Sequence, residues 1–306
     1  MVFDLGGVVL GWDPRRAYEQ VLPAREVDAF MARIDFAGWN RSHDAGRAYA
    51  DGERDLIEEF PADAAAIRAY RQHFGRTLTG MVPGTGALLA ELGRAGVRLL
   101  ALTNWSAETF PHAVERFGIL RRFEDVLVSG AEGLAKPDPA IFRLALRRFG
   151  LEATETVFVD DSPVNVEAAR SLGLTGLDFT DDSALRADLV SLGLVVDREP
   201  VTDAVFHLAD AEAWAVAQAS GHYPWSGRGV GFDAEGFVHC SFAHQVPEVL
   251  ARHYADVPPA ELVLVELDPD RMAGSLVVED LGAGAYPHLF APLDPSSVVD
   301  THPVPG

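Results

Sequence analysis

The chain is poor in lysine. Of its 25 basic residues only Lys136 is a lysine, and the others are arginines. Acidic residues number 46, so the net charge is −21. A charge of this sign argues against partners such as a nucleic-acid backbone or an anionic membrane surface. It does not exclude a phosphorylated small molecule, because a bound cation such as Mg²⁺ reverses the field locally.

Cysteine and long apolar segments are also scarce. Cys240 is the one cysteine, which excludes an internal disulfide and suits a reducing compartment. No run reaches the ~18–20 apolar residues of a membrane span. No basic stretch precedes an apolar one at the N-terminus, so we expect no signal peptide. These features predict a cytoplasmic protein, and they leave its oligomeric state open.

The length of 306 residues allows two domains, which we place at residues 1–197 and 198–306. The second region holds four of the arginines and seven of the ten histidines. In the first region, residues 2–10 are typical of a buried strand that enters a glycine-rich turn. From residue 83 onward, strands alternate with helices, which predicts a parallel sheet and an α/β fold.

Residues 14–80 differ from the rest of the first region. Their periodicity is helical and no strand is evident, so we expect an all-helical insert. The candidate helices lie at residues 15–21, 24–34, 54–60 and 62–74.

Four separated segments carry the residue types that phosphoryl transfer needs. Asp4, Thr103, Lys136 and the pair Asp160–Asp161 fall at or just after predicted strand ends, and one edge of a parallel sheet can gather them. A carboxylate such as Asp4 can attack phosphorus and form a covalent intermediate. Lys136 supplies positive charge to the transferred group, and Thr103 supplies a hydroxyl donor.

The adjacent aspartates also indicate a metal site. Asp160 and Asp161 repel each other unless a cation lies between them, and with Asp4 they form a set of oxygen ligands suited to Mg²⁺. Asn104 can orient the nucleophile or a substrate oxygen. Asn165 can hold the loop or a metal-bound water.

In their order, these segments resemble the four motifs of the haloacid dehalogenase-like (HAD) hydrolase superfamily. The matching stretches are Phe3-Asp-Leu-Gly-Gly-Val-Val9, Leu102-Thr-Asn104, Lys136-Pro-Asp-Pro139 and Phe158-Val-Asp-Asp-Ser-Pro-Val-Asn165. The resemblance covers about residues 1–195 and implies a Rossmann-like core with a helical cap that closes over small phosphorylated metabolites.

The resemblance also implies roles for individual residues. Asp4 corresponds to the nucleophile, Thr103 to a phosphate-binding residue and Lys136 to the group that stabilises the intermediate. Asp161, together with Asp160, corresponds to the Mg²⁺ ligands. The backbone carbonyl of Gly6 is a further ligand implied in this way.

Gly6 departs from the usual pattern of these phosphatases, which carry a second aspartate there as general acid and base. A group of this kind contributes ~10²–10⁴ in rate. Either the substrate has a good leaving group, or another group supplies the proton, or the site only binds its ligand. In the cap region, His43, Asp44 and His73 are the candidate proton donors. We favour an active enzyme.

Other functions stay open at this point. A 2-haloacid dehalogenase attacks carbon without a metal, but the pair Asp160–Asp161 would repel its anionic substrate, which favours Mg²⁺ and phosphate. The chain could also be a catalytically impaired ligand-binding or regulatory protein. A further alternative is a bifunctional enzyme whose first domain dephosphorylates a product of the second.

The second region is rich in histidine. His207, His239 and His288 lie on separate elements and can converge on a pocket that binds a ribose, phosphate or carboxylate. Ser241 lies close by and could instead cap a helix. No histidine or cysteine pair has the compact spacing of a structural zinc site. Cys240 fits a buried apolar position.

Residues 203–302 resemble a family of small bacterial domains of unknown function, the DUF952 type, which has been grouped remotely with ADP-ribosyltransferase-like folds. The stretches that carry the resemblance are His-Leu-Ala-Asp, Gly-Phe-Val-His-Cys-Ser and Pro-His-Leu-Phe-Ala-Pro-Leu. It implies a small α+β domain with a nucleotide- or NAD-type ligand near the three histidines, and we infer no transfer activity from it.

Overall fold

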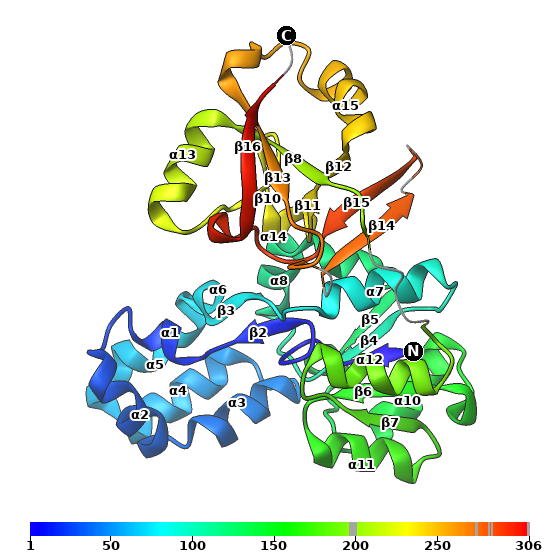
Figure 1. The fold of residues 1–306 in the computed structure, drawn as a ribbon. Helices are drawn as coiled ribbons and strands as arrows, with labels where there is room; N and C mark the ends of the chain where they lie inside the picture. Colours follow the sequence, from blue (N-terminus) through cyan, green and yellow to red (C-terminus); the bar gives the residue numbers. More distant parts are fainter. Residues whose placement is uncertain (196–200, 273–274, 281, 283, 305–306) are drawn as a thin grey trace. The chain divides into compact units, whose positions relative to one another are not determined.

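The computed structural model describes residues 1–195, 201–272, 275–280, 282 and 284–304 (Figure 1). These residues divide into two units. The first comprises Met1–Val82, Arg98–Arg116 and Leu120–Thr180, and the second comprises Pro83–Val97, Phe117–Ile119 and Asp181–Gly306 apart from the gaps. The predicted boundary between residues 197 and 198 lies outside the described residues, so the domain limits at 1–197 and 198–306 remain a prediction.

A parallel five-stranded sheet forms the centre of the first unit. Its strands are β1 (Val2–Phe3), β4 (Leu100–Thr103), β5 (Asp125–Val128), β6 (Val157–Asp160) and β7 (Thr175–Asp178), in the order β5-β4-β1-β6-β7. All four pairings are parallel. The order reverses at β1, and the carboxyl ends of strands at such a point form the usual ligand-binding crevice of an α/β sheet. The predicted α/β class is therefore confirmed.

Amphipathic helices cover this sheet. Helix α10 (Pro139–Phe149) begins at Asp138, whose side chain accepts a hydrogen bond from Ala140 N, and it ends at Gly150 in the left-handed region. Apolar side chains of α10 and α11 (Pro163–Ser171) pack in one buried cluster with those of the strands. The other short helices of this part are α8 (Phe110–Arg116), η2 (Gly118–Arg122), α9 (Ser129–Glu132) and η3 (Ala153–Glu155).

The buried strand and the glycine-rich turn expected over residues 2–10 are both present. Strand β1 stops at Phe3, and β2 (Leu10–Trp12) belongs to a separate two-stranded ladder with β3 (Leu78–Met81). Between them the chain turns through Gly6 and Gly7, and Leu10 N and Val9 N both donate to Leu5 O. The apolar run alone does not show where the strand stops, because most residues of the turn are also buried.

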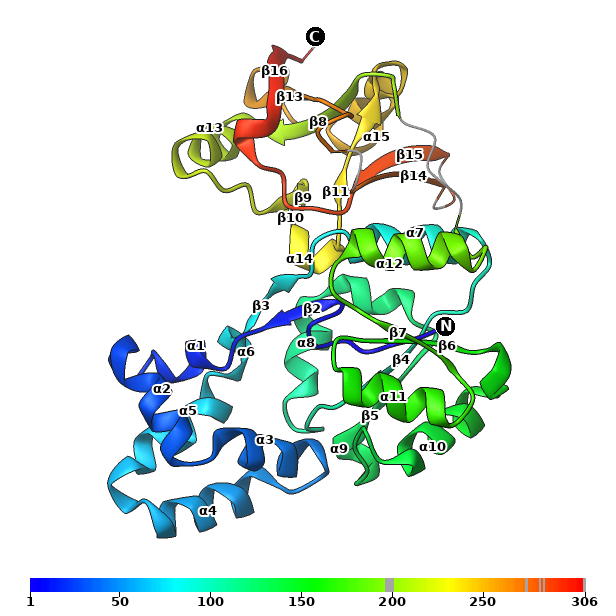
Figure 2. The same ribbon diagram turned by 60° about the horizontal axis from the view of Figure 1, so that its bottom comes forward.

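The helical insert is confirmed, with different bounds. It contains α1 (Arg15–Tyr18), α2 (Ala24–Arg33), α3 (Phe36–Asp44), α4 (Tyr49–Glu59), η1 (Pro61–Asp63), α5 (Ala64–Gln72) and α6 (Phe74–Thr77). Figure 2 shows these helices, blue to cyan, as a bundle joined to the rest of the unit through β2 and β3. We refer to this bundle as the cap.

Helix α3 was not expected from the sequence. Its N-cap, Asp35, has φ 46°, and its side chain accepts a hydrogen bond from Gly38 N. Buried rings hold the helix in place: Phe36 and Trp39 contact Tyr70, with ring centroids 5.1 and 5.8 Å apart. Tertiary packing of aromatic rings therefore stabilises a helix whose local signal is weak.

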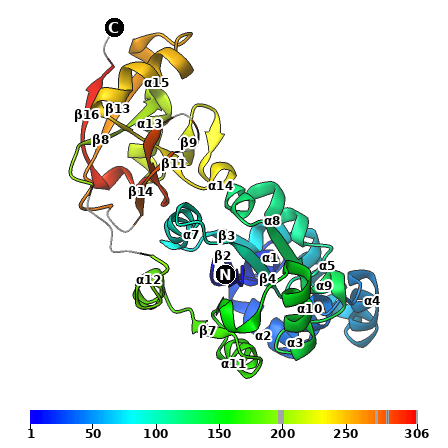
Figure 3. The same cartoon turned by 90° about the vertical axis from the view of Figure 1, so that its right-hand side faces the viewer.

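The second unit consists largely of antiparallel strands. A four-stranded sheet has the order β12-β8-β13-β16, and β13 runs between β8 and β16 (Figure 3). A three-stranded sheet has the order β11-β15-β14, and β9 pairs with β10. The strands are β8 (Val205–Asp210), β9 (Trp225–Gly227), β10 (Val230–Gly231), β11 (Val238–His239), β12 (Ser241–Phe242), β13 (Leu262–Leu267), β14 (Leu276–Asp280), β15 (Ala285–Leu289) and β16 (Val298–Pro303).

Helices accompany these sheets, and the predicted α+β class of the C-terminal region is confirmed. They are α7 (Thr85–Arg94), α12 (Asp182–Ser191), α13 (Ala211–Ser220), α14 (Phe232–Glu235), η4 (Ala243–Gln245), α15 (Val246–His253), η5 (Pro259–Glu261) and η6 (Pro295–Ser297). Asp210 caps α13 by accepting a hydrogen bond from Ala213 N. Ser241 lies in β12, so its alternative role as a helix cap is wrong. No described helix has the length and apolarity to cross a membrane.

Candidate active site

Asp4 lies directly after the central strand β1, at the carboxyl edge of the sheet. Its Oδ1 accepts hydrogen bonds from Leu5 N at 2.7 Å and from Lys136 Nζ at 3.0 Å. Oδ2 has no hydrogen-bond partner among the described residues. Burial raises the pKa of Asp4 to about 6, against the opposing effect of Lys136. The carboxylate is therefore ionised at pH 7, with one oxygen held and the other available.

Lys136 is buried, and its ammonium is surrounded by acceptors. Nζ donates to Leu102 O at 2.9 Å and to Asp160 Oδ2 at 2.6 Å, and it lies 3.0 Å from Asp4 Oδ1. Burial lowers the pKa of Lys136, but Asp4 and Asp160 outweigh this effect, so its pKa is raised and the ammonium stays charged.

Asp160 is fully buried at the end of β6, and its two oxygens are already hydrogen-bonded. Oδ2 accepts from Lys136, while Oδ1 accepts from Ser162 N at 2.8 Å and from Asn165 Nδ2 at 3.0 Å. Asn165 thus holds the loop after β6, which is one of its two predicted roles. The arrangement fixes the position of the lysine ammonium relative to Asp4.

Asp161 differs from its neighbour because its side chain is exposed towards the site. The carboxylate lies against Gly7, where a Cβ would come 2.2 Å from Asp161 Oδ2. Burial and the charge of Asp160 raise the pKa of Asp161. Three oxygens, one each from Asp4, Asp160 and Asp161, lie within 4.8 Å of one another. Hard oxygen donors at this spacing fit a divalent cation such as Mg²⁺.

Thr103 is the last residue of strand β4, and Asn104 follows it. The Thr103 hydroxyl is buried and has no hydrogen-bond partner among the described residues. A buried hydroxyl without a partner costs free energy, so a ligand oxygen is its natural acceptor. The Asn104 amide is occupied differently: Nδ2 donates to Lys136 O at 2.9 Å, and Oδ1 accepts from Lys136 N at 2.8 Å. This pair of bonds fixes the loop that carries the lysine.

A cavity of about 290 Å³ opens above Asp4 and is lined by both the sheet edge and the cap. Aromatic side chains form much of its wall: Trp12, Tyr49, Tyr70, Phe74 and Trp105. The polar lining residues are Asp4, Asn40, Asp44, Asn104, Thr109 and Asp161, together with Gly6 and Gly7. Asn40, Thr109 and the aromatic residues were not expected from the sequence, because only the tertiary fold shows that they line one cavity.

The three candidate proton donors of the cap lie in different surroundings. Asp44 lines the cavity, and its Oδ2 accepts from Asn40 Nδ2 at 2.9 Å. His43 is buried, with Nδ1 2.8 Å from Arg47 O and its ring stacked on Tyr49. His73 is half-buried at the end of α5 and does not line the cavity. The structure therefore brings Asp44, but not the histidines, into the same cavity as Asp4.

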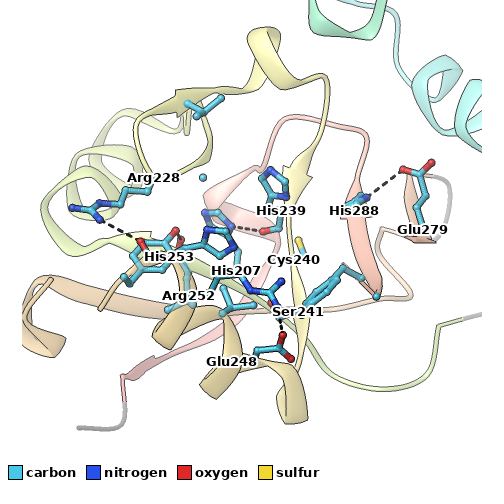
Figure 4. Close-up of a pocket in the computed structure, with 17 residues that line it drawn as sticks. His207, Arg228, His239, Cys240, Ser241, Glu248, Arg252, His253, Glu279 and His288 are labelled. Atoms are coloured by element: carbon cyan, nitrogen blue, oxygen red, sulfur yellow. Dashed lines mark hydrogen bonds and ion pairs between the residues drawn. The ribbon is translucent and has the colours of Figure 1, made fainter. Parts of the chain in front are cut away.

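The residues singled out in the C-terminal region also come together. His207, His239, Ser241 and His288 line a separate cavity of about 460 Å³ (Figure 4). Among the described residues, no histidine belongs to a cluster with metal-ligand spacing. Cys240 is buried, and burial raises its pKa to about 12, so its thiol stays protonated at pH 7.

The parallel sheet carries an acidic, lysine-bearing site at its carboxyl edge, and comparison with known proteins identifies the family. A model described as haloacid dehalogenase-like hydrolase matches residues 1–173. The chain belongs to this family and is a hydrolase. A second model, for a protein family of unknown function (DUF952), matches residues 208–301.

Several relatives are known proteins. A sesquiterpene phosphatase of Aspergillus oryzae is 29% identical over 194 residues, which cover 62% of this chain and 94% of that protein. A phosphoserine phosphatase of Thermus thermophilus is 38% identical over 124 residues, 40% of this chain and half of that protein. The crystal structure of a HAD family enzyme from Bacteroides thetaiotaomicron matches with a TM-score of 0.49 and 22% identity, covering 59% of this chain and 92% of that one.

Proposed function

We propose that the chain is a Mg²⁺-dependent phosphatase of a small phosphomonoester that acts through a phosphorylated Asp4. One observation carries the proposal: Asp4 and Asp161 offer carboxylate oxygens beside a buried lysine ammonium and an unpartnered Thr103 hydroxyl. Such a set holds a phosphate dianion and a metal together. The phosphatases among the relatives support the same reaction class.

Each residue then has a stated part in the reaction. An oxygen of Asp4 attacks phosphorus, and the bond from phosphorus to the ester oxygen breaks. Lys136 and the hydroxyl of Thr103 stabilise the charge of the phosphoryl oxygens. Water then attacks phosphorus, the bond to Asp4 breaks, and inorganic phosphate leaves.

Mg²⁺ would be held by Asp4, Asp161 and the carbonyl of Gly6. It would supply positive charge to the phosphoryl oxygens when bound. Since the oxygens of Asp160 already accept from Lys136, Ser162 and Asn165, we assign Asp160 mainly to positioning the lysine. In the same way, Asn104 positions Lys136 through its backbone.

Asp44 of the cap replaces the general acid that is missing at Gly6. It shares the cavity with Asp4, and its side chain is held by Asn40. Burial and the charge of Asp4 raise the pKa of Asp44 to about 7. Protonated Asp44 gives its proton to the leaving ester oxygen, and the carboxylate then takes a proton from the attacking water.

The substrate must fit the cavity. At about 290 Å³ with five aromatic side chains in its wall, the cavity suits a compact phosphomonoester with an apolar or ring-shaped organic part. The predicted partner, a small phosphorylated metabolite, therefore stands as part of the proposal. The predicted cytoplasmic location also stays a prediction.

A phosphatase screen tests this function. We expect the purified chain to release phosphate from at least one small phosphomonoester in the presence of Mg²⁺, and EDTA to remove this activity. Asp4→Asn removes the nucleophile and should abolish turnover while the melting temperature changes little. If no ester is hydrolysed, or if Asp4→Asn retains full activity, the proposal is wrong.

The role of Asp44 predicts an effect that depends on the leaving group. Asp44→Asn should lower kcat by ~10²–10⁴ for alkyl phosphates, whose alkoxide leaving groups need a proton. With p-nitrophenyl phosphate, whose leaving group needs little protonation, the change should stay within about threefold. Since the acid form of Asp44 prevails below a pKa of about 7, alkyl phosphate turnover should fall as pH rises through that value.

Gly6 offers a matched test of this role. A Cβ at Gly6 meets no atom within 4 Å, so a side chain can begin there without a clash. Gly6→Asp should restore alkyl phosphate turnover to Asp44→Asn, whereas Gly6→Asn should not. An equal loss for both leaving groups, or no rescue by Gly6→Asp, would assign Asp44 to structure rather than to proton transfer.

A metal-independent 2-haloacid dehalogenase is the alternative reaction. Its anionic substrate would meet the carboxylates of Asp160 and Asp161 without a compensating cation. Chloride release from 2-chloropropionate in the presence of EDTA, with no phosphate release under any condition, would favour this alternative over the phosphatase.

The second domain has a function of its own in our proposal. The predicted nucleotide- or NAD-type ligand is supported by one observation, the shared cavity of His207, His239 and His288. We therefore assign the region that matches DUF952 to binding a small ligand.

A further inference from the structure

Positive charge in the C-terminal region gathers at one cavity. Residues 198–306 contain sixteen acidic residues and four arginines. Arg228 and Arg252 both line the cavity, as do four histidines: His207, His239, His253 and His288. Half of the arginines and most of the histidines of this acidic region therefore line one cavity.

The inner wall of the cavity is built from histidines with fixed hydrogen-bond roles. The His239 carbonyl accepts from His207 Nδ1 at 2.8 Å, so His207 Nε2 is the acceptor of the Tyr223 hydroxyl at 2.8 Å. Burial lowers the pKa of His207 to about 4, which agrees with this neutral ring. His207 therefore holds the backbone that presents His239.

His239 itself has no hydrogen-bond partner for its ring among the described residues. The ring stands edge-on to His288, with centroids 5.5 Å apart, and to Phe237 at 4.9 Å. Burial and the neighbouring histidines lower the pKa of His239 to about 4, so it is neutral at pH 7. Its ring is thus left to offer one donor and one acceptor to a ligand.

His288 is oriented by a buried partner. Its Nδ1 donates to Glu279 Oε2 at 3.2 Å, and both side chains are buried (Figure 4). The other ring nitrogen, Nε2, takes no part in this bond, and His288 lines the cavity. Two imidazoles, one free and one oriented by a carboxylate, therefore stand side by side in the wall.

The outer part of the cavity is charged and adaptable. Arg252 pairs with Glu248 at 2.6 Å on α15, and Arg228 pairs with Asp256 at 2.6 Å. All four side chains are about half exposed or more. Exposed pairs of this kind contribute only ~0–1 kcal/mol, so an anion can compete for the guanidinium groups. A planar guanidinium matches a phosphate with two parallel hydrogen bonds.

We propose that this cavity binds a phosphorylated small molecule, with the phosphate at Arg252 and an uncharged polar part at His239 and His288. The inference rests on the proposed ligand-binding role of this domain and goes beyond it by naming the charged group and its contacts. A volume of about 460 Å³ is larger than a phosphate ion needs and lies in the usual range for metabolite sites. A nucleotide and a sugar phosphate share this chemistry.

Calorimetric titration of the full chain at pH 7 without Mg²⁺ tests the inference. The probes are AMP, ribose 5-phosphate, adenosine and inorganic phosphate, and the Asp4→Asn background prevents hydrolysis. We expect AMP or ribose 5-phosphate to bind at least about tenfold more tightly than adenosine or inorganic phosphate, since one charge-assisted contact contributes ~1.5–3 kcal/mol. Binding of AMP but not of ribose 5-phosphate would identify a nucleotide site. Binding of ribose 5-phosphate would identify a sugar phosphate site.

Variants locate the binding. Arg252→Gln should weaken binding of the phosphorylated probe about tenfold or more, and His239→Ala should also weaken its binding. Glu248→Gln, which releases Arg252 and removes a negative charge, should strengthen binding of the same probe. Arg271→Gln is the matched control, because Arg271 belongs to the same domain and does not line the cavity.

The outcomes separate the two levels of the proposal. If none of the probes binds, the ligand-binding role itself fails. If adenosine binds as tightly as AMP, or if Arg271→Gln weakens binding as much as Arg252→Gln, the phosphate assignment is overturned while a ligand-binding role stands. Binding that Thr103→Val removes would place the probe in the first site and overturn the inference.

Discussion

Lys136→Arg should lower kcat by on the order of 10³ although the charge is kept. The ammonium is compact and makes short contacts with Leu102 O, Asp160 and Asp4 in a fully buried space. A guanidinium is larger and planar, so it cannot replace a point charge among these three acceptors without displacing Asp4 or Asp160. The measurement is kcat with p-nitrophenyl phosphate at saturating Mg²⁺.

Two further variants show whether the loss is chemical or structural. Arg148→Lys changes an exposed pair with Asp125 and should leave kcat unchanged. Lys136→Met leaves Asp4 and Asp160 buried without a counter-charge and should lower the free energy of unfolding by about 3–5 kcal/mol. Retention of more than about a tenth of the activity by Lys136→Arg would contradict the requirement for a compact ammonium.

Gly7→Ala should remove the metal site. Gly7 has φ 76°, and an added Cβ would come 2.2 Å from Asp161 Oδ2 and 2.8 Å from its Cγ. The Asp161 carboxylate must then move away from Asp4. We expect the Mg²⁺-dependent rise in melting temperature to disappear and kcat to fall by ~10²–10³, the usual cost of losing one group that stabilises developing charge.

Gly96→Ala is the control for this prediction. Gly96 has the same φ of 76°, but a Cβ there meets no atom within 4 Å. Both variants carry the cost of a left-handed alanine, ~1–2 kcal/mol, and only Gly7→Ala displaces a carboxylate. Equal loss of the Mg²⁺ effect in both would mean that backbone strain, rather than the position of Asp161, is responsible.

Parts of the fold could be predicted because their signals are local. Helix α10 begins after Asp138 with a proline at its first position and ends before Gly150, so local signals mark its bounds at Pro139 and Phe149. The buried strand and glycine-rich turn expected over residues 2–10 are present, but the sequence does not show that the strand stops at Phe3 or that Leu10 begins a second ladder with β3. Apolarity reports burial, and it does not distinguish a buried strand from a buried turn.

The candidate site divides in the same way. Four site residues lie at the end of a strand or in the segment after it: Asp4, Thr103, Lys136 and Asp160. Their motifs and the parallel order of the sheet therefore predict that they meet. From the sequence, Asp44 was one of three candidate proton donors. Whether Asp44 or His43 faces the cavity depends on the rotation of α3, and buried aromatic contacts set this rotation.

One lysine and three aspartates, in four ordered motifs, could be read from the sequence alone and indicate a hydrolase. The sequence also shows that Gly6 cannot be the general acid that protonates the leaving group, and it leaves this role unassigned. Only the tertiary structure decided which cap residue faces Asp4, that Asp160 holds Lys136, and that three distant histidines share a cavity with two arginines. A sequence motif shows which residues lie at the end of a strand. The direction of a side chain on a helix or an edge strand depends on the residues that pack against that element, and only the tertiary structure shows these residues.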